Sequence, residues 1–294
     1  MKKDNKVFFG YGAALASTFL FGLGDVLTKA IYMSGVNPLM LFKIRVDFSV
    51  IILLGVLLIF SRKSLRIEKK DIFKYFILGV VGFSGFVVCC MIAISMINVG
   101  VAVFLQYLAP AFIIFFYWTV FHQKPSRTII IAVMLTIIGG LLMIFSPGNH
   151  IQLGFLGIFF GVMCAILYGF SSVFGKKLNE KYSPMTTLFY SLLFSAIAWF
   201  FVPTGHFNMY SLTPQLIGIY IYVIAVYTVL TYGLFFYALS QLSATNTTLI
   251  ASLEPVIAAV IAYFFLSEKM SVIEIFGGLL LLLAIYILQR TSAS

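Results

Sequence analysis

Apolar stretches about as long as a bilayer is thick run through nearly the whole sequence, and they constrain the fold more than any other feature. A helix that crosses a membrane needs about 20 apolar residues, because each residue adds about 1.5 Å along the axis. Prolines fall at the edges of several stretches, where helices end. We predict ten spanning helices, over residues 7–28, 38–60, 72–96, 99–121, 127–146, 154–175, 184–203, 215–238, 246–266 and 272–289.

The composition indicates that lipid is the solvent of this chain. Of its 294 residues, 62% are hydrophobic and 10% are charged. A soluble domain is about 45–50% apolar and about 25% charged, so this chain could not cover itself with polar surface. The three cysteines, Cys89, Cys90 and Cys164, lie in apolar runs and indicate no disulfide framework. The predicted fold class is an all-α integral membrane protein.

The basic residues sort to one side of the predicted helices. With a cytoplasmic N-terminus, fifteen of the 19 lysines and arginines fall in cytoplasmic segments, and only Lys29 and Lys269 fall outside. The positive-inside rule requires this bias. The formal charge of +10 therefore needs no nucleic-acid partner, and both termini are predicted to be cytoplasmic.

The two halves of the sequence repeat. Pro110 matches Pro255 at a shift of 145 residues, and the small-residue ridges that contain Gly22 and Gly169 match at a shift of 147. Such ridges let helices approach closely. Five spans is an odd number, so the second copy would enter the membrane upside down, which is an architecture of transporters with a midplane site between the repeats. We assign the two inverted five-helix repeats to residues 1–147 and 148–294.

Two matched segments carry a resemblance to a known family. They are YLAPAFIIFFYWTVFHQKPS, residues 107–126, and SLEPVIAAVIAYFFLSEKMS, residues 252–271. They resemble the EamA repeat of the drug/metabolite transporter superfamily. The second copy carries Glu254 before its proline, where the first has Ala109, so the copies do not supply equivalent carboxylates. The resemblance implies a ten-span transporter of amino acids, amines, drugs or nucleotide sugars, often working outward.

Five ionisable residues lie within predicted spans. An unpaired charge at the membrane centre costs about 2.5–3.5 kcal/mol, so each needs a partner, water or neutralisation. Lys43 and Asp47 are four residues apart on one helical face and could pair. Asp25 and Arg45 reach similar depths near the outer side and could form an ion-pair gate. The alternatives are a static folding clamp and basic side chains that extend toward the lipid headgroups.

The fifth ionisable residue is Glu254, which has no basic residue in its own helix. Pro255 frees the carbonyl of Ala251 and favours a kink, because proline lacks an N–H group. This polar position could hold a substrate ammonium group or a proton. Alternatively, a protonated glutamate bonds to the freed carbonyl and has no role in transport.

Aromatic residues make up 17% of the chain, and some tyrosines are expected to face a cavity because a buried phenol needs a polar partner. Rings in such a cavity could bind an amine or an aromatic solute by cation–π or stacking contacts. A tyrosine in the core or at the membrane interface is the alternative for each. The predicted substrate-binding residues are Glu254, Tyr107, Gln106, Tyr168, Tyr227, Tyr232 and Trp199.

Enzyme signatures are absent from the sequence. The three histidines, His122, His150 and His206, fall in loops without metal-ligand spacing, and no phosphate-binding glycine loop occurs. We interpret the chain as a secondary active transporter that exports amino acids, amines or related drugs by alternating access across a bacterial cytoplasmic membrane. Its predicted partners are the substrate, protons and lipid, without cofactor or metal, in a monomer or homodimer. The alternatives are a facilitative uptake carrier for a cationic metabolite and a membrane-embedded enzyme.

The charge bias generates a topological prediction. In a background without the native cysteines, Lys69→Cys should react with an impermeant thiol reagent only from the cytoplasm. Asn208→Cys, in the matching loop of the second copy, should react only from outside. Labelling of both positions from one side would contradict the inverted repeat.

Overall fold

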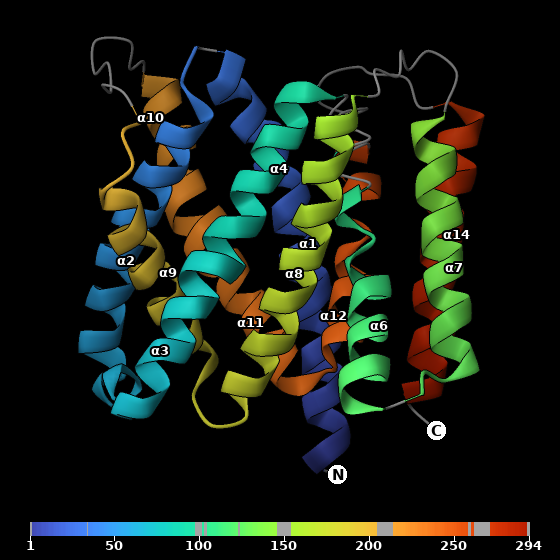
Figure 1. The fold of residues 1–294 in the computed structure, drawn as a ribbon, viewed down its shortest axis with the longest axis horizontal. Helices are drawn as coiled ribbons and strands as arrows, with labels where there is room; N and C mark the ends of the chain where they lie inside the picture. The colour runs from blue at the N-terminus through green and yellow to red at the C-terminus, as the bar shows by residue number, and fades with distance from the viewer. Residues whose placement is uncertain are drawn as a thin grey trace. The chain divides into compact units, whose positions relative to one another are not determined.

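The computed structural model is built from α-helices, with two π-helices and a 3-10 helix among the described elements (Figure 1). In each of the ten predicted stretches, the described residues are helical in whole or in part, and the described part of the chain contains no β-strand. The prediction of an all-α protein is confirmed. The structure describes residues 2–33, 35–97, 102, 105–122, 124–145, 154–204, 214–257, 260–261 and 271–292.

The helices follow one another in the same order in the two halves of the chain. In the first half these are α1 (Lys2–Met33), α2 (Pro38–Phe60), the 3-10 helix η1 (Arg62–Leu65), α3 (Lys69–Ile77), the π-helix η2 (Leu78–Ser84), α4 (Gly85–Met96), α6 (Ala109–Phe121) and α7 (Arg127–Ile144). In the second half they are α8 (Phe155–Asn179), α9 (Pro184–Phe200), α10 (Pro214–Ile221), the π-helix η4 (Tyr222–Leu230), α11 (Thr231–Gln241), α12 (Ala244–Ala251) and α14 (Val272–Ser292).

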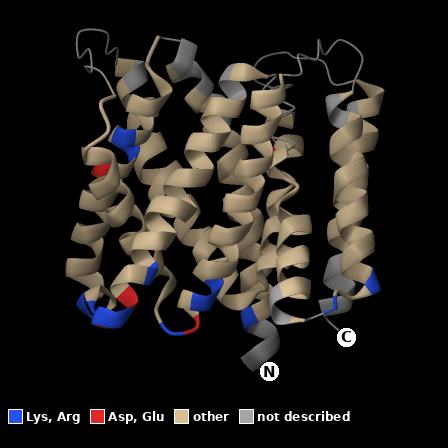
Figure 2. Cartoon of the chain, viewed as in Figure 1, with Lys and Arg blue, Asp and Glu red and all other residues tan. Residues whose placement is uncertain are grey.

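Long apolar helices account for the membrane character of the chain. Among the described residues, four helices are long and apolar enough to cross a bilayer, and shorter apolar helices accompany them. Large apolar side chains such as Phe60 and Phe155 are more than four-fifths exposed, which suits contact with lipid. Figure 2 shows basic residues near the C-terminal end of α2 and the start of α3, and a second group of charged residues within α2. The four long helices are Lys6–Gly24, Lys69–Ala93, Phe155–Asn179 and Ile217–Gln241.

Local side chains define where several helices begin. Asn37 accepts a hydrogen bond from the backbone N–H of Leu39, and Pro38 occupies the first position of α2. The Ser126 and Ser183 hydroxyls accept from backbone N–H groups in the same way at the starts of α7 and α9. These caps satisfy N–H groups that have no partner within the helix.

The structure repeats itself at the interval that the sequence predicts. The helix of α3, η2 and α4 begins at Lys69, and that of α10, η4 and α11 begins at Pro214, 145 residues later. Each contains a π-helix in its middle. The starts of α7 and α14 are separated by the same interval. The internal duplication is therefore visible in the backbone, whereas the opposite orientation of the copies in a membrane stays a prediction.

The helices pack into two compact units, and each unit is discontinuous in sequence. Unit 1 comprises Met1–Ser84 and Phe174–Gln241, and unit 2 comprises Gly85–Val173 and Leu242–Ser294. In unit 1, α1 packs against α11, and α2 packs against α9 and η4.

In unit 2, the main helix pair is α7 and α14. A Cβ atom added at Gly139 would lie 2.6 Å from the carbonyl oxygen of Gly277. Glycine thus lets the two backbones approach closely, which is a common basis of helix association in membranes.

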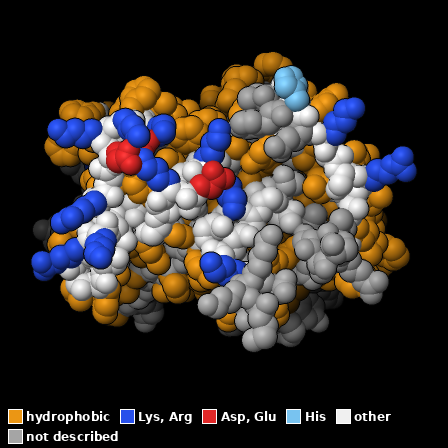
Figure 3. Space-filling view, turned by 90° about the horizontal axis from the view of Figure 1, so that it is seen from below, with side chains coloured by type: hydrophobic (Ala, Val, Ile, Leu, Met, Phe, Trp, Pro, Cys, Tyr) orange, Lys and Arg blue, Asp and Glu red, His pale blue; other side chains and the backbone are white. Residues whose placement is uncertain are grey.

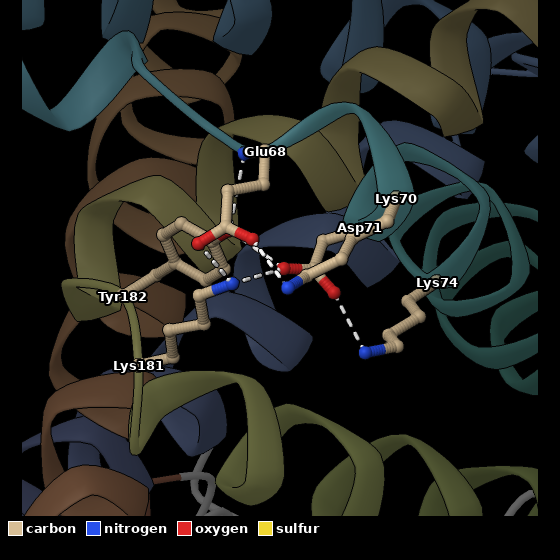
Figure 4. A network of polar contacts seen from close by, with 6 residues as sticks. All are labelled: Glu68, Lys70, Asp71, Lys74, Lys181 and Tyr182. Carbon is tan, nitrogen blue, oxygen red and sulfur yellow. Dashed lines mark hydrogen bonds and ion pairs between the residues drawn. The ribbon is translucent and has the colours of Figure 1, made fainter.

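A polar network joins the start of α3 to the segment between α8 and α9 (Figure 4). The Asp71 carboxylate, whose side chain is 1% exposed, lies 2.6 Å from the Nζ atoms of both Lys74 and Lys181. The Tyr182 hydroxyl donates to the same carboxylate over 2.7 Å. Lys181 also pairs with Glu68. In Figure 3, the view from below, acidic side chains lie among basic ones on this face.

The network changes the pKa values of its exposed members, Glu68 and Lys181. Lys181, with a smaller contribution from Lys70, lowers the pKa of Glu68 below its usual value. Asp71 and then Glu68 raise the pKa of Lys181. A carboxyl whose pKa is depressed by folding stabilises the folded state above its unfolded pKa of about 4.3, and this contribution disappears as the pH falls below that value.

We predict that Lys181→Met lowers the melting temperature of the purified protein by a few degrees at pH 7, because Asp71 and Glu68 lose a shared cation. The difference from the wild type should shrink as the pH falls below about 4. Lys70→Met is the matched control, since among the described residues Lys70 forms an ion pair with the exposed Glu68 alone, and it should have a smaller effect. Equal effects of the two changes would contradict this account.

Candidate functional site

Arg45 is buried in the interior of α2, although it is charged. Its side chain is 9% exposed, and its Nε group donates to the hydroxyl of Thr228 over 3.2 Å. The guanidinium carbon lies 4.4 Å from the centroid of the Tyr227 ring. Arginine stacks well on aromatic rings, and a desolvated cation–π contact is worth about 2 kcal/mol. The structure therefore fixes the guanidinium group against η4.

The π-helix η4 supplies backbone acceptors to side chains around Arg45. The Thr228 hydroxyl donates to the carbonyl of Val223 over 2.7 Å, a partner five residues back along the chain. The Ser49 hydroxyl, one turn beyond Arg45 on α2, donates to the carbonyl of Ile224 over 3.2 Å. π-helical segments are frequent at functional sites because they change the direction of side chains and backbone groups.

Aromatic rings surround Tyr227 and connect it to two other predicted residues. The Phe21 ring lies 5.7 Å from that of Tyr227 and 4.9 Å from that of Tyr232, in edge-on geometry. Phe83 lies 4.9 Å from Tyr232. The Trp199 ring, in turn, lies 4.9 Å from that of Phe42, which stacks on Phe83. The structure thus brings Trp199, Tyr227 and Tyr232 together in unit 1 through Phe21, Phe42 and Phe83.

Sequence reasoning missed these three phenylalanines, because it treated phenylalanines as scattered lipid-facing or packing residues. Phe21, Phe42 and Phe83 are 6%, 3% and 2% exposed. Their helices are apolar on all sides, so no periodic pattern separates the buried rings from those that face lipid.

A close approach of α1 to η4 places Tyr227 beneath Arg45. A Cβ atom added at Gly24 would lie 1.8 Å from Cδ2 of the Tyr227 ring. Only glycine leaves room for the ring at this position. The predicted ridge residue Gly22 is also buried in α1, but the ring packs against Gly24.

The structure describes two of the other charged residues of the predicted gate, Lys43 and Asp47, but not the side chain of the third, Asp25. Lys43 and Asp47 are half-buried one turn apart on α2, and the Lys43 ammonium lies 5.9 Å from the Phe200 ring centroid. The ion pairs within 4.0 Å among the described residues all belong to the Asp71 network, so they do not include Lys43 with Asp47. The side chain of Asp25 lies outside the described residues, and its pairing with Arg45 stays a prediction.

Unit 2 contains two matching interruptions of helical structure, one before each repeated proline. The N–H of Leu108 bonds to the carbonyl of Leu105, and the N–H of Leu253 bonds to the carbonyl of Ile250, both over 3.1 Å and only three residues back. Regular helix resumes at Ala109 in the first copy and at Glu254 in the second.

The second interruption determines the position of Glu254. The helix α12 ends at Ala251 and a new turn starts at Glu254, so the chain is broken ahead of Pro255 rather than kinked by it. Glu254 is 9% exposed. The Ser252 hydroxyl donates to the carbonyl of Leu249 over 2.6 Å, which satisfies one acceptor at the end of α12.

The other predicted residues of unit 2 lie near the first interruption. Gln106 accepts a hydrogen bond from the Cys164 thiol of α8 over 3.6 Å, and Tyr107 is 5% exposed. On α8, the Tyr168 ring lies 5.3 Å from that of Phe86.

The packing of α8 against α6 depends on a predicted glycine. A Cβ atom added at Gly169 would lie 3.2 Å from Cγ1 of Ile113 and 3.4 Å from the carbonyl oxygen of Ala109. Glycine at position 169 thus allows α8 to approach α6 closely beside Pro110, which is the role predicted for the small-residue ridge.

The described residues contain no group of three or more histidine, cysteine or carboxylate side chains that could hold a metal ion. The arrangement offers instead a buried guanidinium with aromatic neighbours in unit 1 and a buried carboxyl at a helix interruption in unit 2. Such groups can bind and release charged ligands. They do not form a nucleophile–base pair of the kind that covalent catalysis needs.

Comparison with known proteins gives consistent matches over nearly the whole chain. The model of the EamA-like transporter family matches residues 8–145 and again residues 155–290. An uncharacterized transporter of Archaeoglobus fulgidus is 28% identical over 73% of this chain and 76% of its own. The uncharacterized inner membrane transporter YicL of Salmonella typhimurium is 23% identical over 95% and 94%. A crystal structure with 13% sequence identity shares the fold with a TM-score of 0.75, over 98% of this chain and 96% of that one.

We predict that Gly24→Ala destabilises the protein by about 1–3 kcal/mol, because the added methyl group displaces the Tyr227 ring from its place under Arg45. Gly12→Ala on the same helix is the control, since a Cβ atom at Gly12 meets no heavy atom within 4 Å. Thermal unfolding in detergent should show a lower melting temperature for Gly24→Ala and an unchanged or slightly higher one for Gly12→Ala. Similar melting temperatures for the two variants would show that the contact with Tyr227 has no energetic weight.

Proposed function

The chain belongs to the EamA-like transporter family, and from this premise we propose that it is a secondary active transporter of small organic metabolites. It is a multi-pass membrane protein of a family of transporters. We infer that it exports amino acids, amines or related drugs by alternating access. We place it in a bacterial cytoplasmic membrane with both termini in the cytoplasm, as the distribution of lysines and arginines favours.

The observation that carries the proposal is the position of Glu254. Its side chain is buried in an apolar span, at the first residue after an interruption of the helix. Ionisable residues within spans are rare and are usually functional, because a charge in hydrocarbon is costly. Interrupted helices provide substrate and ion sites in secondary transporters, since unpaired backbone groups are tolerated only where they are buried in protein or line a cavity.

The matching interruption in the first copy supports a role for the carboxyl group itself. Ala109 stands where the second copy has Glu254, and both breaks show the same backbone hydrogen bond. The break therefore does not need a glutamate to form. We propose that Glu254 is retained for its charge and not for the geometry of the break.

A buried carboxylate can be neutralised by a proton or by a substrate ammonium group, and it can hold only one of them at a time. In the proposed cycle, binding of the substrate ammonium displaces the proton from Glu254, and release of the substrate allows a proton to return. Proton entry on one side of the membrane and substrate release on the same side would couple the two fluxes. The two inverted repeats, at residues 1–147 and 148–294, would alternate access between the sides.

We predict that Glu254→Gln leaves a folded protein but lowers proton-driven transport about tenfold or more, because the amide cannot lose a proton. Exchange of substrate across the membrane should survive to a larger extent, since exchange does not require proton release. Proteoliposomes with an imposed pH gradient measure both rates. Glu180→Gln, an exposed glutamate in the turn after α8, is the control and should transport normally.

A wild-type rate and pH profile for Glu254→Gln would remove the proposed coupling role. Glu254 would then serve as a protonated group bonded to the backbone. Saturable transport that is independent of pH in the wild type would favour a facilitative carrier.

A further inference from the structure

Arg45 has no assigned task in the proton exchange proposed for Glu254, yet a guanidinium group, unlike a carboxyl group, keeps its charge when it is buried. It lies seven residues after the first residue of α2, about 10 Å along the helix axis. Only 9% of its surface is exposed. An arginine that served only as a membrane anchor would extend its charged end toward the lipid headgroups. The contacts with Tyr227 and Thr228 hold this guanidinium group inward instead.

Most N–H donors of Arg45 make no hydrogen bond within the part of the protein that the structure describes. A guanidinium group carries five N–H donors. Nε donates to the Thr228 hydroxyl, and no other atom of the described residues accepts a hydrogen bond from Arg45. The ion pairs of the described residues do not include it. The terminal nitrogens, which carry four of the donors, therefore have capacity for an anionic ligand.

The surroundings of Arg45 hold it in one orientation. Thr228 is itself fixed by its hydrogen bond to Val223, and Tyr227 is confined between Phe21 and Gly24. A guanidinium group that is already oriented loses little further conformational entropy when it binds, which strengthens recognition. Its planar, forked donors match the two oxygens of a carboxylate.

We propose that Arg45 binds the carboxylate of the transported molecule, so that the substrates are amino acids rather than simple amines. This inference rests on the proposed function and narrows the class of molecule that it moves. It also gives the buried cation a partner during transport, because the substrate supplies the negative charge that the described neighbours of Arg45 lack. A molecule without the carboxylate leaves the terminal nitrogens of Arg45 without that partner.

The test compares amino acids with the amines formed by their decarboxylation. The probes are L-leucine with 3-methylbutylamine, L-phenylalanine with 2-phenylethylamine, and L-lysine with cadaverine. Binding to the purified full-length protein is measured by calorimetry, and flux is measured separately in proteoliposomes. For at least one pair, we expect the wild type to bind the amino acid about 10- to 100-fold more tightly than the amine, as a charged hydrogen bond allows.

Variants then assign the discrimination to Arg45. Arg45→Gln should lose most of the preference for the amino acid, and Arg45→Lys should retain part of it. Thr228→Val keeps the cation but removes its orienting contact, so it should weaken the preference less. Should Arg45→Gln fail to fold, Thr228→Val still tests the proposal through the same ratio. Arg62→Gln, an exposed arginine at the start of η1, just after α2, is the control and should leave the preference unchanged.

Several outcomes would overturn the inference. One is that the wild type binds the amines as tightly as the amino acids, or more tightly, and another is that it binds neither class. A third is that Arg45→Gln loses affinity for amino acids and amines equally, which would indicate that Arg45 is a structural clamp. Saturable, pH-dependent amine flux without any preference would overturn the role of Arg45 and leave the proposed transport function standing. Selective binding of an amino acid without flux would support the role of Arg45 and contradict the proposed transport cycle.

Discussion

Every backbone N–H and C=O group of a chain in hydrocarbon must find its partner within the protein, and the described structure follows from this requirement. Regular helices satisfy it without help from side chains. The π-helices η2 and η4 and the breaks at Leu108 and Leu253 depart from regular bonding, and side chains compensate at some of them. The Ser49 hydroxyl, for example, bonds to a carbonyl of η4. Of the two buried ionisable residues, Arg45 packs against η4 and Glu254 follows the break at Leu253, so each lies next to an irregular segment of backbone.

The sequence predicted the features that depend on local information. Hydropathy over about 20 residues located the ten helical stretches, and the repeated prolines predicted where the helices of the two copies would deviate. Glu254 and Arg45 could be identified because a charge within an apolar run stands out whatever its neighbours are. The family was identified for the same reason, since its repeat is a linear pattern of residues.

The neighbours of these charges could not be predicted, because depth in a membrane does not specify a contact. The sequence suggested Asp25 as a partner of Arg45, and that pairing stays a prediction because the Asp25 side chain lies outside the described residues. The contacts of Arg45 with Tyr227 and Thr228, more than 180 residues away, were not predicted. A π-helix adds a residue to a turn and rotates the following side chains, so the face of η4 cannot be read from a regular helical period. The network around Asp71 joins the start of α3 to the segment between α8 and α9, which are about 110 residues apart in the sequence.

The discontinuity of the two units has a consequence for biosynthesis. Helix α7 leaves the ribosome more than one hundred residues before α14, against which it packs through Gly139 and Gly277. At about 5–20 residues per second, this interval lasts on the order of ten seconds. Unit 1 likewise waits for the segment Phe174–Gln241 before its helices can pack. During translation the bilayer must therefore hold the early helices as separately inserted segments, and a chain that stops after α7 completes neither unit.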